Sequence, residues 1–284
     1  MKALSLFSGC GGLDLGFVRA GGEVVAAYEF DAKACAGYER VMGHSIQQAD
    51  LTSIDVKSLP DTEGIIGGPP CQAFSLSNSQ HEDIGPSSSK NMWPQTLSIV
   101  QAKRPLWFVF ENVRHMVYSR HSRAYFHELL NILTGYGYRV EYRILNAADY
   151  GVPQTRERVF IVGRLDGKAW SWPEETHAEK LQMFSHRWIS WKAALADWRS
   201  DAQLADIPPW IKKRELYANG WNTDAYFNTQ EARHTRFHRD GDKPAFTVTG
   251  GGSGTHTNCL GWESISRRHT GYRDYSNPPR SRSE

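Results

Sequence analysis

Short apolar runs alternate with amphipathic segments along the first part of the chain. Runs rich in β-branched and aromatic residues predict strands at 3–7, 22–29, 64–67, 106–111, 138–145 and 158–164. Apolar positions at helical spacing predict helices at 13–20, 31–42, 94–103 and 125–133. Alternation of this kind indicates a mostly parallel sheet with helices packed on it. We therefore expect an α/β fold with a doubly wound, mostly parallel sheet over residues 1–165.

The pattern changes after Arg164. Periodicity becomes weak, and Trp, Arg, Lys and His become frequent, as in "HRWISWKAALADW". This predicts a second, smaller and irregular domain over residues 166–263, followed by a polar, basic tail over 264–284. A long polar segment also lies within the first domain, between Gln72 and Asn91. Such a loop inside a compact domain is usually functional or disordered.

The composition indicates a cytoplasmic protein without a membrane span, but it does not indicate what the protein binds. The chain has 284 residues, and 33 Lys and Arg nearly balance 31 Asp and Glu, so net charge argues neither for nor against a nucleic-acid partner. Four widely spaced cysteines without a CxxC pair, and an opening without a signal peptide, predict a cytoplasmic protein. No apolar run approaches the roughly 20 residues that cross a bilayer. His234 and His238 lack further ligands nearby in the sequence, so we expect no metal.

The segment "LFSGCGGLDLGF" places Gly9 and Gly11 where the first predicted strand turns into the first helix. Glycines there let the backbone approach a ligand closely, although glycines also serve ordinary tight turns. Glu29 ends the second predicted strand, at the spacing from which an acid can accept hydrogen bonds from ribose hydroxyls. No lysine follows the glycines as in a phosphate-binding P-loop, so a nucleoside without a triphosphate fits better.

The segment "GGPPCQ" places Cys71 after a buried strand and two prolines. The prolines restrict the backbone and so pre-set the direction of the thiol, which makes Cys71 a candidate nucleophile. Cys35, by contrast, lies within an amphipathic helix and reads as a small buried apolar residue.

Two further clusters lie at strand ends. "FVFENV" ends in Glu111 and Asn112, and a carboxyl group there is either ion-paired or functional. In "PQTRERVF", Arg156 and Arg158 point to the same side of an extended chain, so one of them could face Glu111. A nucleophile, a carboxyl group and an arginine pair beside a glycine-rich loop indicate an active site.

Taken together, these motifs resemble those of the C5-cytosine DNA methyltransferases of bacterial restriction-modification systems. "FSGCGG" is similar to the family's S-adenosylmethionine loop, "PPCQ" to its nucleophile motif, "ENV" to its glutamate motif and "QTRERVFIVG" to its arginine motif. "RHTRFHRDGDKPAFTVTGG" is similar to the element that supports the family's target recognition domain. The resemblance implies a Rossmann-like S-adenosylmethionine-dependent fold, double-stranded DNA as partner and a place in the prokaryotic cytosol or nucleoid.

The resemblance also implies residue roles. Cys71 would attack C6 of a cytosine flipped out of the duplex, while Glu111, Arg158 and Arg156 would hold the ring. Asn112 would brace the strand end, and the Gln72 to Asn91 loop would close over the base. The implied cofactor-binding residues are Phe7, Gly9, Gly11, Glu29, Phe30, Asp50, Leu51, Gly68, Pro70 and Met92, where Met92 stands in place of the family's leucine.

The tail departs from the family pattern. Members normally close with a segment that completes the cofactor pocket, whereas residues 264–284 are polar, basic and poor in apolar residues. Truncation, a shifted reading frame or a second polypeptide that supplies the segment would each account for this. Methylation of tRNA cytosine, and an inactive or partial subunit that binds DNA without turnover, are the alternative functions.

Overall fold

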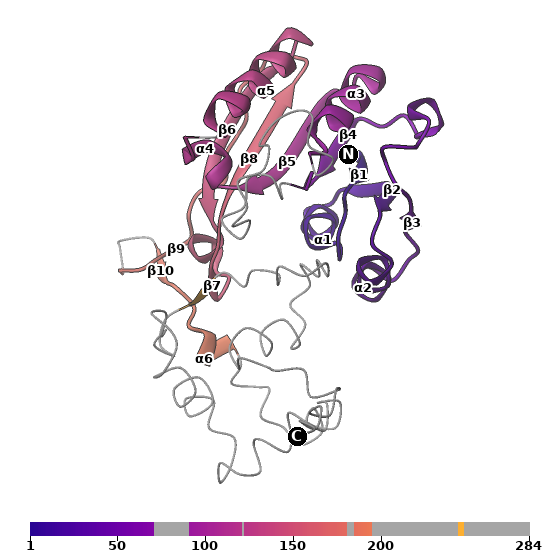
Figure 1. Cartoon of the computed structure of the whole chain (residues 1–284). Coiled ribbons are helices and arrows are strands. Elements are labelled where there is room, and N and C mark those ends of the chain that lie inside the picture. Colours follow the sequence, from indigo (N-terminus) through magenta and orange to yellow (C-terminus); the bar gives the residue numbers. More distant parts are fainter. Residues whose placement is uncertain (71–90, 121, 181–184, 195–243, 247–284) are drawn as a thin grey trace, which may run out of the picture.

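The computed structural model describes residues 1–70, 91–120, 122–180, 185–194 and 244–246 (Figure 1). A seven-stranded sheet of order β3-β2-β1-β4-β5-β8-β6 forms its centre. The strands of this sheet are β1 (Lys2–Leu6), β2 (Glu23–Glu29), β3 (Gln47–Gln48), β4 (Gly64–Gly67), β5 (Trp107–Val113), β6 (Arg139–Asn146) and β8 (Glu157–Arg164). Two-residue strands form two further pairs, in which β9 (His177–Ala178) lies beside β10 (His186–Arg187) and β7 (Gln154–Thr155) beside β11 (Ala245–Phe246).

Helices lie on both faces of the sheet. They are α1 (Gly12–Arg19), α2 (Ala32–Met42), α3 (Trp93–Lys103), α4 (His115–Tyr118), α5 (Arg123–Gly135) and α6 (Trp191–Ala194), with short 3-10 turns at Val56–Ser58 and Ala147–Tyr150. The crossover from β1 to β2 runs toward one edge of the sheet and the crossover from β4 to β5 toward the other. Because such crossovers are right-handed, α1 and α3 must lie on opposite faces, and Figure 1 shows α1 and α2 across the sheet from α3 and α5.

Strand direction is uniform except at one strand. The pairs β1 with β2, β1 with β4, β2 with β3 and β4 with β5 are parallel, whereas β8 runs antiparallel to both β5 and β6. Only the ten residues 147–156 separate β6 from β8. That connection is too short to carry a crossover helix, so the chain must turn back beside β6.

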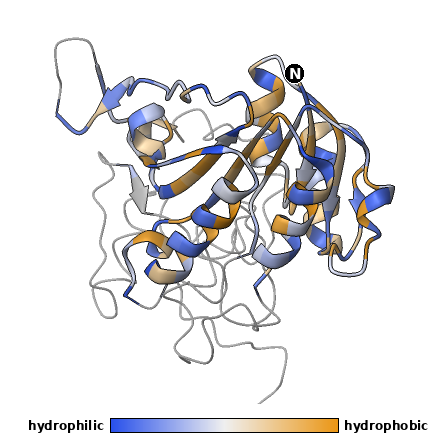
Figure 2. Cartoon of the chain, turned by 90° about the horizontal axis from the view of Figure 1, so that it is seen from above, coloured by the Kyte–Doolittle hydropathy of each residue, from blue (hydrophilic) through white to orange (hydrophobic). Residues whose placement is uncertain are grey.

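The core lies between the sheet and its helices. Its fully buried side chains come from the strands (Leu4, Leu6, Ile65, Phe108, Phe110, Ile161) and from α3 and α5 (Ile99, Val100, Phe126, Leu133). Figure 2 shows that the helices carry both hydrophobic and hydrophilic stretches, as amphipathic elements do when one side packs on a sheet. Phe108 stacks on Phe110 with ring centroids 5.0 Å apart. This packing fixes β5, whose end carries Glu111.

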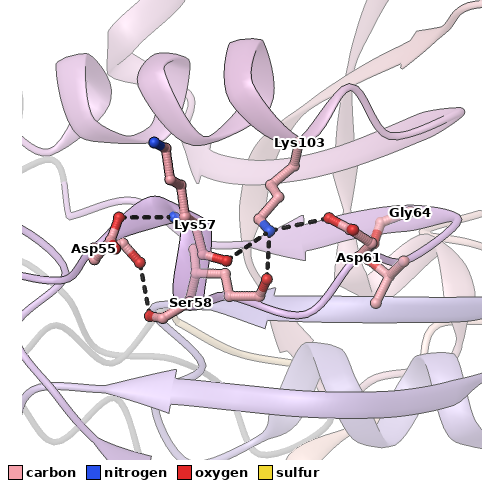
Figure 3. Close-up of polar contacts among 8 residues, drawn as sticks. Asp55, Lys57, Ser58, Asp61, Gly64 and Lys103 are labelled. Carbon is pink, nitrogen blue, oxygen red and sulfur yellow. Dashed lines mark hydrogen bonds and ion pairs between the residues drawn. The ribbon is translucent and has the colours of Figure 1, made fainter.

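Lys103, at the end of α3, holds the loop that leads into β4 (Figure 3). Its ammonium group donates to the carbonyl oxygens of Lys57 and Leu59 and pairs with Asp61, whose Oδ1 lies 3.0 Å away. The Lys103 side chain is only 11% exposed, so these contacts replace most of the water around its charge. The start of β4, the strand that leads to Pro69 and Pro70, is anchored in this way.

The expectation of a mostly parallel, doubly wound sheet is confirmed, and each predicted strand and helix of the first domain is present within a few residues of its expected bounds. The short β3 and α4 were not predicted. Most of the expected second domain and all of the tail lie outside the described residues. Among the helices that the structure describes, none combines the length and apolar character needed to span a membrane.

Candidate active site

Several predicted site residues that the structure describes lie at one edge of the sheet, beside the point where successive crossovers run in opposite directions. β1 has β2 on one side and β4 on the other, so the loops after β1 and β4 leave in opposite directions. In open α/β sheets, ligands bind outside the carboxyl ends of the strands at such a point. The Phe7 to Gly11 loop, Glu29 and Gly68 follow or end strands at this edge, and Glu111 is one of the last three residues of β5.

Glu111 is paired with Arg158. Arg158 Nε lies 2.8 Å from Glu111 Oε1, and Arg156 Nη2 lies 4.0 Å from the same oxygen. The side chains of Glu111, Arg158 and Arg156 are 28%, 16% and 31% exposed, so the cluster is accessible while much of each side chain is covered. Burial lowers the pKa of Arg156, and the neighbouring positive charge of Arg158 adds to this. The expectation that an arginine of this motif faces Glu111 is met by both residues.

Glu111 also lies against the chain that leads to the predicted nucleophile. A Cβ placed on Gly68 would lie 3.5 Å from Glu111 Oε2, so the two residues are neighbours. Asn112, which is 2% exposed, donates from Nδ2 to the carbonyl oxygen of Pro69 at 3.0 Å. Asn112 therefore ties the end of β5 to the segment after β4. Cys71 and most of the predicted Gln72 to Asn91 loop lie outside the described residues.

The glycine-rich loop is joined to Glu29. Gly9 N donates to Glu29 Oε2 at 2.9 Å, and the N–H groups of Phe30 and Asp31 both donate to Oε1 at 2.9 Å. An ionised carboxylate has about four acceptor positions, so about one, on Oε2, stays available to a ligand hydroxyl. Gly9 and Gly11 have φ of 54° and 83°, a region that favours glycine.

The other predicted cofactor residues differ in how they are presented. Phe30 is 69% exposed next to Glu29, and Phe7 packs partly against the core. Asp50 is exposed, and its Oδ1 accepts from Thr52 N and Oγ1. Leu51 is 3% exposed within the core, so its side chain is not open to a ligand. Half-buried Met92 precedes α3, and Pro70 is half-buried after β4.

A cavity of about 440 Å³ adjoins the Glu111 cluster. Glu111, Arg156 and Arg158 line it, together with Tyr150, Phe160, Trp170 and Trp172. Trp172 stacks under the guanidinium of Arg143, whose Cζ lies 5.2 Å from its ring centroid. The sequence did not predict these aromatic lining residues, because Trp170 and Trp172 follow the last strand in a segment without periodicity. Their spacing of two, as in an extended chain, was the one available signal.

The sequence also made predictions about residues outside the candidate site. Cys35 is 8% exposed, as expected of a buried apolar residue, and burial raises the pKa of its thiol. His234 and His238 lie outside the described residues. Within the described part of the chain, no three His, Cys, Asp or Glu side chains gather as metal ligands.

The chain is similar to known proteins over most of its length. The family model described as C-5 cytosine-specific DNA methylase matches residues 1–267. The type II methyltransferase M.NgoFVII of Neisseria gonorrhoeae is 42% identical over 182 residues, which cover 63% of this chain and 48% of that protein. M.AquIA of Picosynechococcus is 37% identical over 202 residues, or 64% of this chain and 79% of that protein. The chain spans about half the length of the first curated relatives that it matches.

Solved structures show the same fold. A putative DNA modification methyltransferase from an Escherichia coli prophage aligns with a TM-score of 0.58 at 22% identity, over 87% of this chain and 82% of that one. The Spodoptera frugiperda DNMT2 mutant aligns with a TM-score of 0.52 at 20% identity, over 68% of this chain and 58% of that one. Because the family model covers nearly the whole chain and the sheet has this fold, the chain belongs to the C-5 cytosine-specific DNA methylase family.

Proposed function

We propose that the chain carries the catalytic domain of a type II DNA cytosine-5 methyltransferase. It would transfer a methyl group from S-adenosylmethionine to C5 of a cytosine flipped out of duplex DNA. The observation that carries the proposal is the 2.8 Å pair of Glu111 and Arg158 beside Gly68, at the sheet edge where the chain leads to Cys71. Membership of the DNA methylase family supports DNA as the substrate.

Residues at the glycine-rich loop fit the cofactor. Glu29 keeps about one acceptor position for a ribose hydroxyl, and the exposed ring of Phe30 beside it offers a face to adenine. Gly9 has no atom within 4 Å of the place where a Cβ would lie, so its backbone is open to a ligand. When bound, S-adenosylmethionine supplies an electrophilic methyl group. Phe7, Gly11, Asp50, Leu51, Gly68, Pro70 and Met92 would complete its contacts, Leu51 through its backbone.

The chemistry begins at the thiol. C5 of cytosine is a poor nucleophile, and attack of the Cys71 thiolate on C6 would form a C6–S bond that makes C5 electron-rich. Negative charge develops on the ring during this attack. Glu111 would donate a proton to N3 and accept a hydrogen bond from the exocyclic amine, and Arg158 would hold O2, so both would stabilise the negative charge on the ring.

Arg156 and Asn112 would act around this centre. Arg156 would add positive charge beside Glu111, and Asn112 would keep the Pro69 segment in place so that the thiol approaches C6. Once C5 carries the methyl group, transfer of the C5 proton to a base and return of the N3 proton to Glu111 would let the C6–S bond break, which restores aromaticity and free Cys71. The Gln72 to Asn91 loop would close over the flipped base and exclude water.

The remaining roles fall to the second domain and to partners. Residues 166–263 would form a target-recognition domain whose Lys and Arg meet phosphates. The protein would act in the prokaryotic cytosol or nucleoid, where its DNA lies. A second polypeptide that supplies the family's closing segment stays a prediction: methylation that appears only when such a polypeptide is added would support it.

The proposal is tested by tritium transfer from labelled S-adenosylmethionine to duplex DNA. We expect incorporation by the wild-type chain, none by Cys71→Ser and normal incorporation by Cys35→Ala, which removes the thiol that lies within α2. Full activity of Cys71→Ser would contradict the covalent route. Tritium that enters tRNA rather than DNA would show that tRNA is the substrate. DNA binding without S-adenosylmethionine binding would identify an inactive or partial subunit.

A further inference from the structure

A buried carboxyl group lies under the glycine-rich loop, and the mechanism above does not use it. Asp14, in the first turn of α1, is 0% exposed. Ser5 Oγ donates to its Oδ1 at 2.7 Å, and the Tyr38 hydroxyl donates to its Oδ2 at 2.9 Å. Burial raises the pKa of Asp14, and these two hydrogen bonds oppose the rise. The carboxyl group thus has two branches of contacts, one toward β1 and one toward α2.

The first branch continues into the loop. Ser5 gives its single hydroxyl proton to Asp14, so it must accept in its 2.7 Å contact with Ser8 Oγ. Ser8 is then the donor in that contact. The carbonyl oxygen of Tyr28, 3.3 Å from Ser8 Oγ, is a second possible acceptor for the Ser8 hydroxyl proton, at a longer distance. Asp14 therefore sets the orientation of the Ser8 hydroxyl through one intermediate side chain.

Ser8 lies between two residues of unusual backbone conformation. Phe7 has a φ of 53° and Gly9 a φ of 54°. A bulky residue rarely adopts a positive φ, and such a conformation persists only where its surroundings hold it. Ser8 is held at its backbone, since its N–H donates to Tyr28 O at 3.1 Å and its carbonyl oxygen accepts from Gly11 N at 2.9 Å. The hydroxyl adds a third anchor.

We propose that Asp14 is a positioning residue for S-adenosylmethionine, which acts through Ser5 and Ser8 to hold the Phe7 to Gly11 turn in its ligand-binding shape. The inference rests on the proposed function, because it concerns the same cofactor loop. The second branch supplies a control. Tyr38 bonds the same carboxyl group, and its ring packs against Gly11, where an added Cβ would lie 2.9 Å from Tyr38 Cδ2. Tyr38→Phe keeps that ring and removes only the hydroxyl.

The experiment compares Ser5→Ala, Ser8→Ala and Tyr38→Phe in the full chain. Ser5→Ala and Tyr38→Phe each delete one hydroxyl bonded to Asp14, but only Ser5→Ala cuts the path to the loop. By calorimetry with S-adenosylmethionine, we expect Ser5→Ala and Ser8→Ala to raise Kd about 5- to 10-fold and Tyr38→Phe to change it less than about 2-fold. Ser8→Thr, which keeps a hydroxyl, should restore affinity.

Amide hydrogen exchange provides a readout that needs no cofactor. Gly9 and Gly11 should exchange faster in Ser8→Ala than in the wild-type chain and at the wild-type rate in Tyr38→Phe. Equal losses of affinity in Ser5→Ala and Tyr38→Phe, or unchanged Kd and exchange in Ser8→Ala, would overturn the inference. If Ser5→Ala fails to fold, the Kd and exchange rates of Ser8→Ala decide the question, because Ser8 is only half-buried. A wild-type chain that binds no S-adenosylmethionine contradicts the proposed function, while the exchange rates still decide whether the hydroxyl chain holds the loop.

Discussion

Arg158 and Arg156 reach the same oxygen of Glu111 at different distances. Arg158 Nε makes an ion pair at 2.8 Å, whereas Arg156 Nη2 lies at 4.0 Å, the outer limit of an ion pair. The attraction between two opposite charges strengthens as the distance between them falls. Arg158 is therefore the residue that orients the carboxyl group, and Arg156 contributes mainly through its charge.

This difference predicts unequal effects of matched substitutions. Arg158→Lys keeps the charge but loses the planar fork, so we expect the single-turnover methylation rate to fall about 10- to 100-fold. Arg156→Lys should lower it several-fold less. Rapid-quench assays with saturating S-adenosylmethionine measure both rates. Equal rates for the two variants would show that charge alone matters at this position.

Tyr138 offers a pH-dependent prediction. Burial raises the pKa of Tyr138 to about 12, against an opposing effect of Arg104, and its hydroxyl donates to Pro105 O at 2.7 Å. Because its folded-state pKa lies above the unfolded value of 10.0, its contribution to stability is complete below about pH 10 and is lost as pH rises through 12.

We therefore expect Tyr138→Phe to be less stable than wild type by about 1 kcal/mol at pH 8, with a smaller difference at pH 11. Urea unfolding at the two pH values measures this. A difference that grows between pH 8 and pH 11 would mean that the sign of the shift is wrong.

At the scale of elements, the sequence predicted where the strands lie along the chain better than it predicted whether they run parallel or antiparallel. Apolar runs located β4 and β5 because buried strands have a local signature, and Glu111 could be placed at a strand end for the same reason. Those runs carry no information on direction, so the antiparallel β8 was not specified. The length of the β6 to β8 connection, only ten residues, was the signal that could have shown it.

The site could be predicted only where its residues lie in motifs. Glu111, Arg156 and Arg158 are close in the structure because β5 and β8 are neighbours, which their spacing at strand ends allowed us to expect. The bonds of Asp14 to Ser5 and Tyr38 join three elements. Contacts between residues far apart in the sequence produce no periodic pattern of apolar positions. The hydrogen-bond partners of Asp14, within an amphipathic helix, could therefore not be predicted.

The contacts of Lys103 at the end of α3 yield a stability prediction. Lys103→Met removes the ammonium group from the carbonyl oxygens of Lys57 and Leu59 and leaves them short of a donor. We expect the free energy of unfolding to fall by about 1–3 kcal/mol. Lys57→Met is the matched control, since the Lys57 side chain is exposed and only its carbonyl takes part. Denaturant unfolding that gives equal losses for both variants would contradict the role of this contact.

At the scale of the whole molecule, the described fold carries the candidate site at one edge of its sheet, and the proposed target-recognition role falls on residues 166–263. The strands of the sheet lie between Lys2 and Arg164. Trp170 N donates to Glu141 on β6, so the segment after β8 also contacts this sheet. The formal net charge of +2 gives no strong field, so the proposed binding to DNA would depend on local clusters of Lys and Arg.

The central claim is that Cys71 bonds transiently to a cytosine that Glu111 and Arg158 hold. Fluorine at C5 cannot leave as a proton does, so 5-fluorocytosine in a pool of duplexes with random flanking sequence would trap the bond after methyl transfer. Mass spectrometry of the digested complex is the direct measurement. The account predicts that, with S-adenosylmethionine present, the peptide containing Cys71 carries the methylated base, and that Cys71→Ser yields no adduct. An adduct on another residue, or methylated DNA from Cys71→Ser, would contradict it.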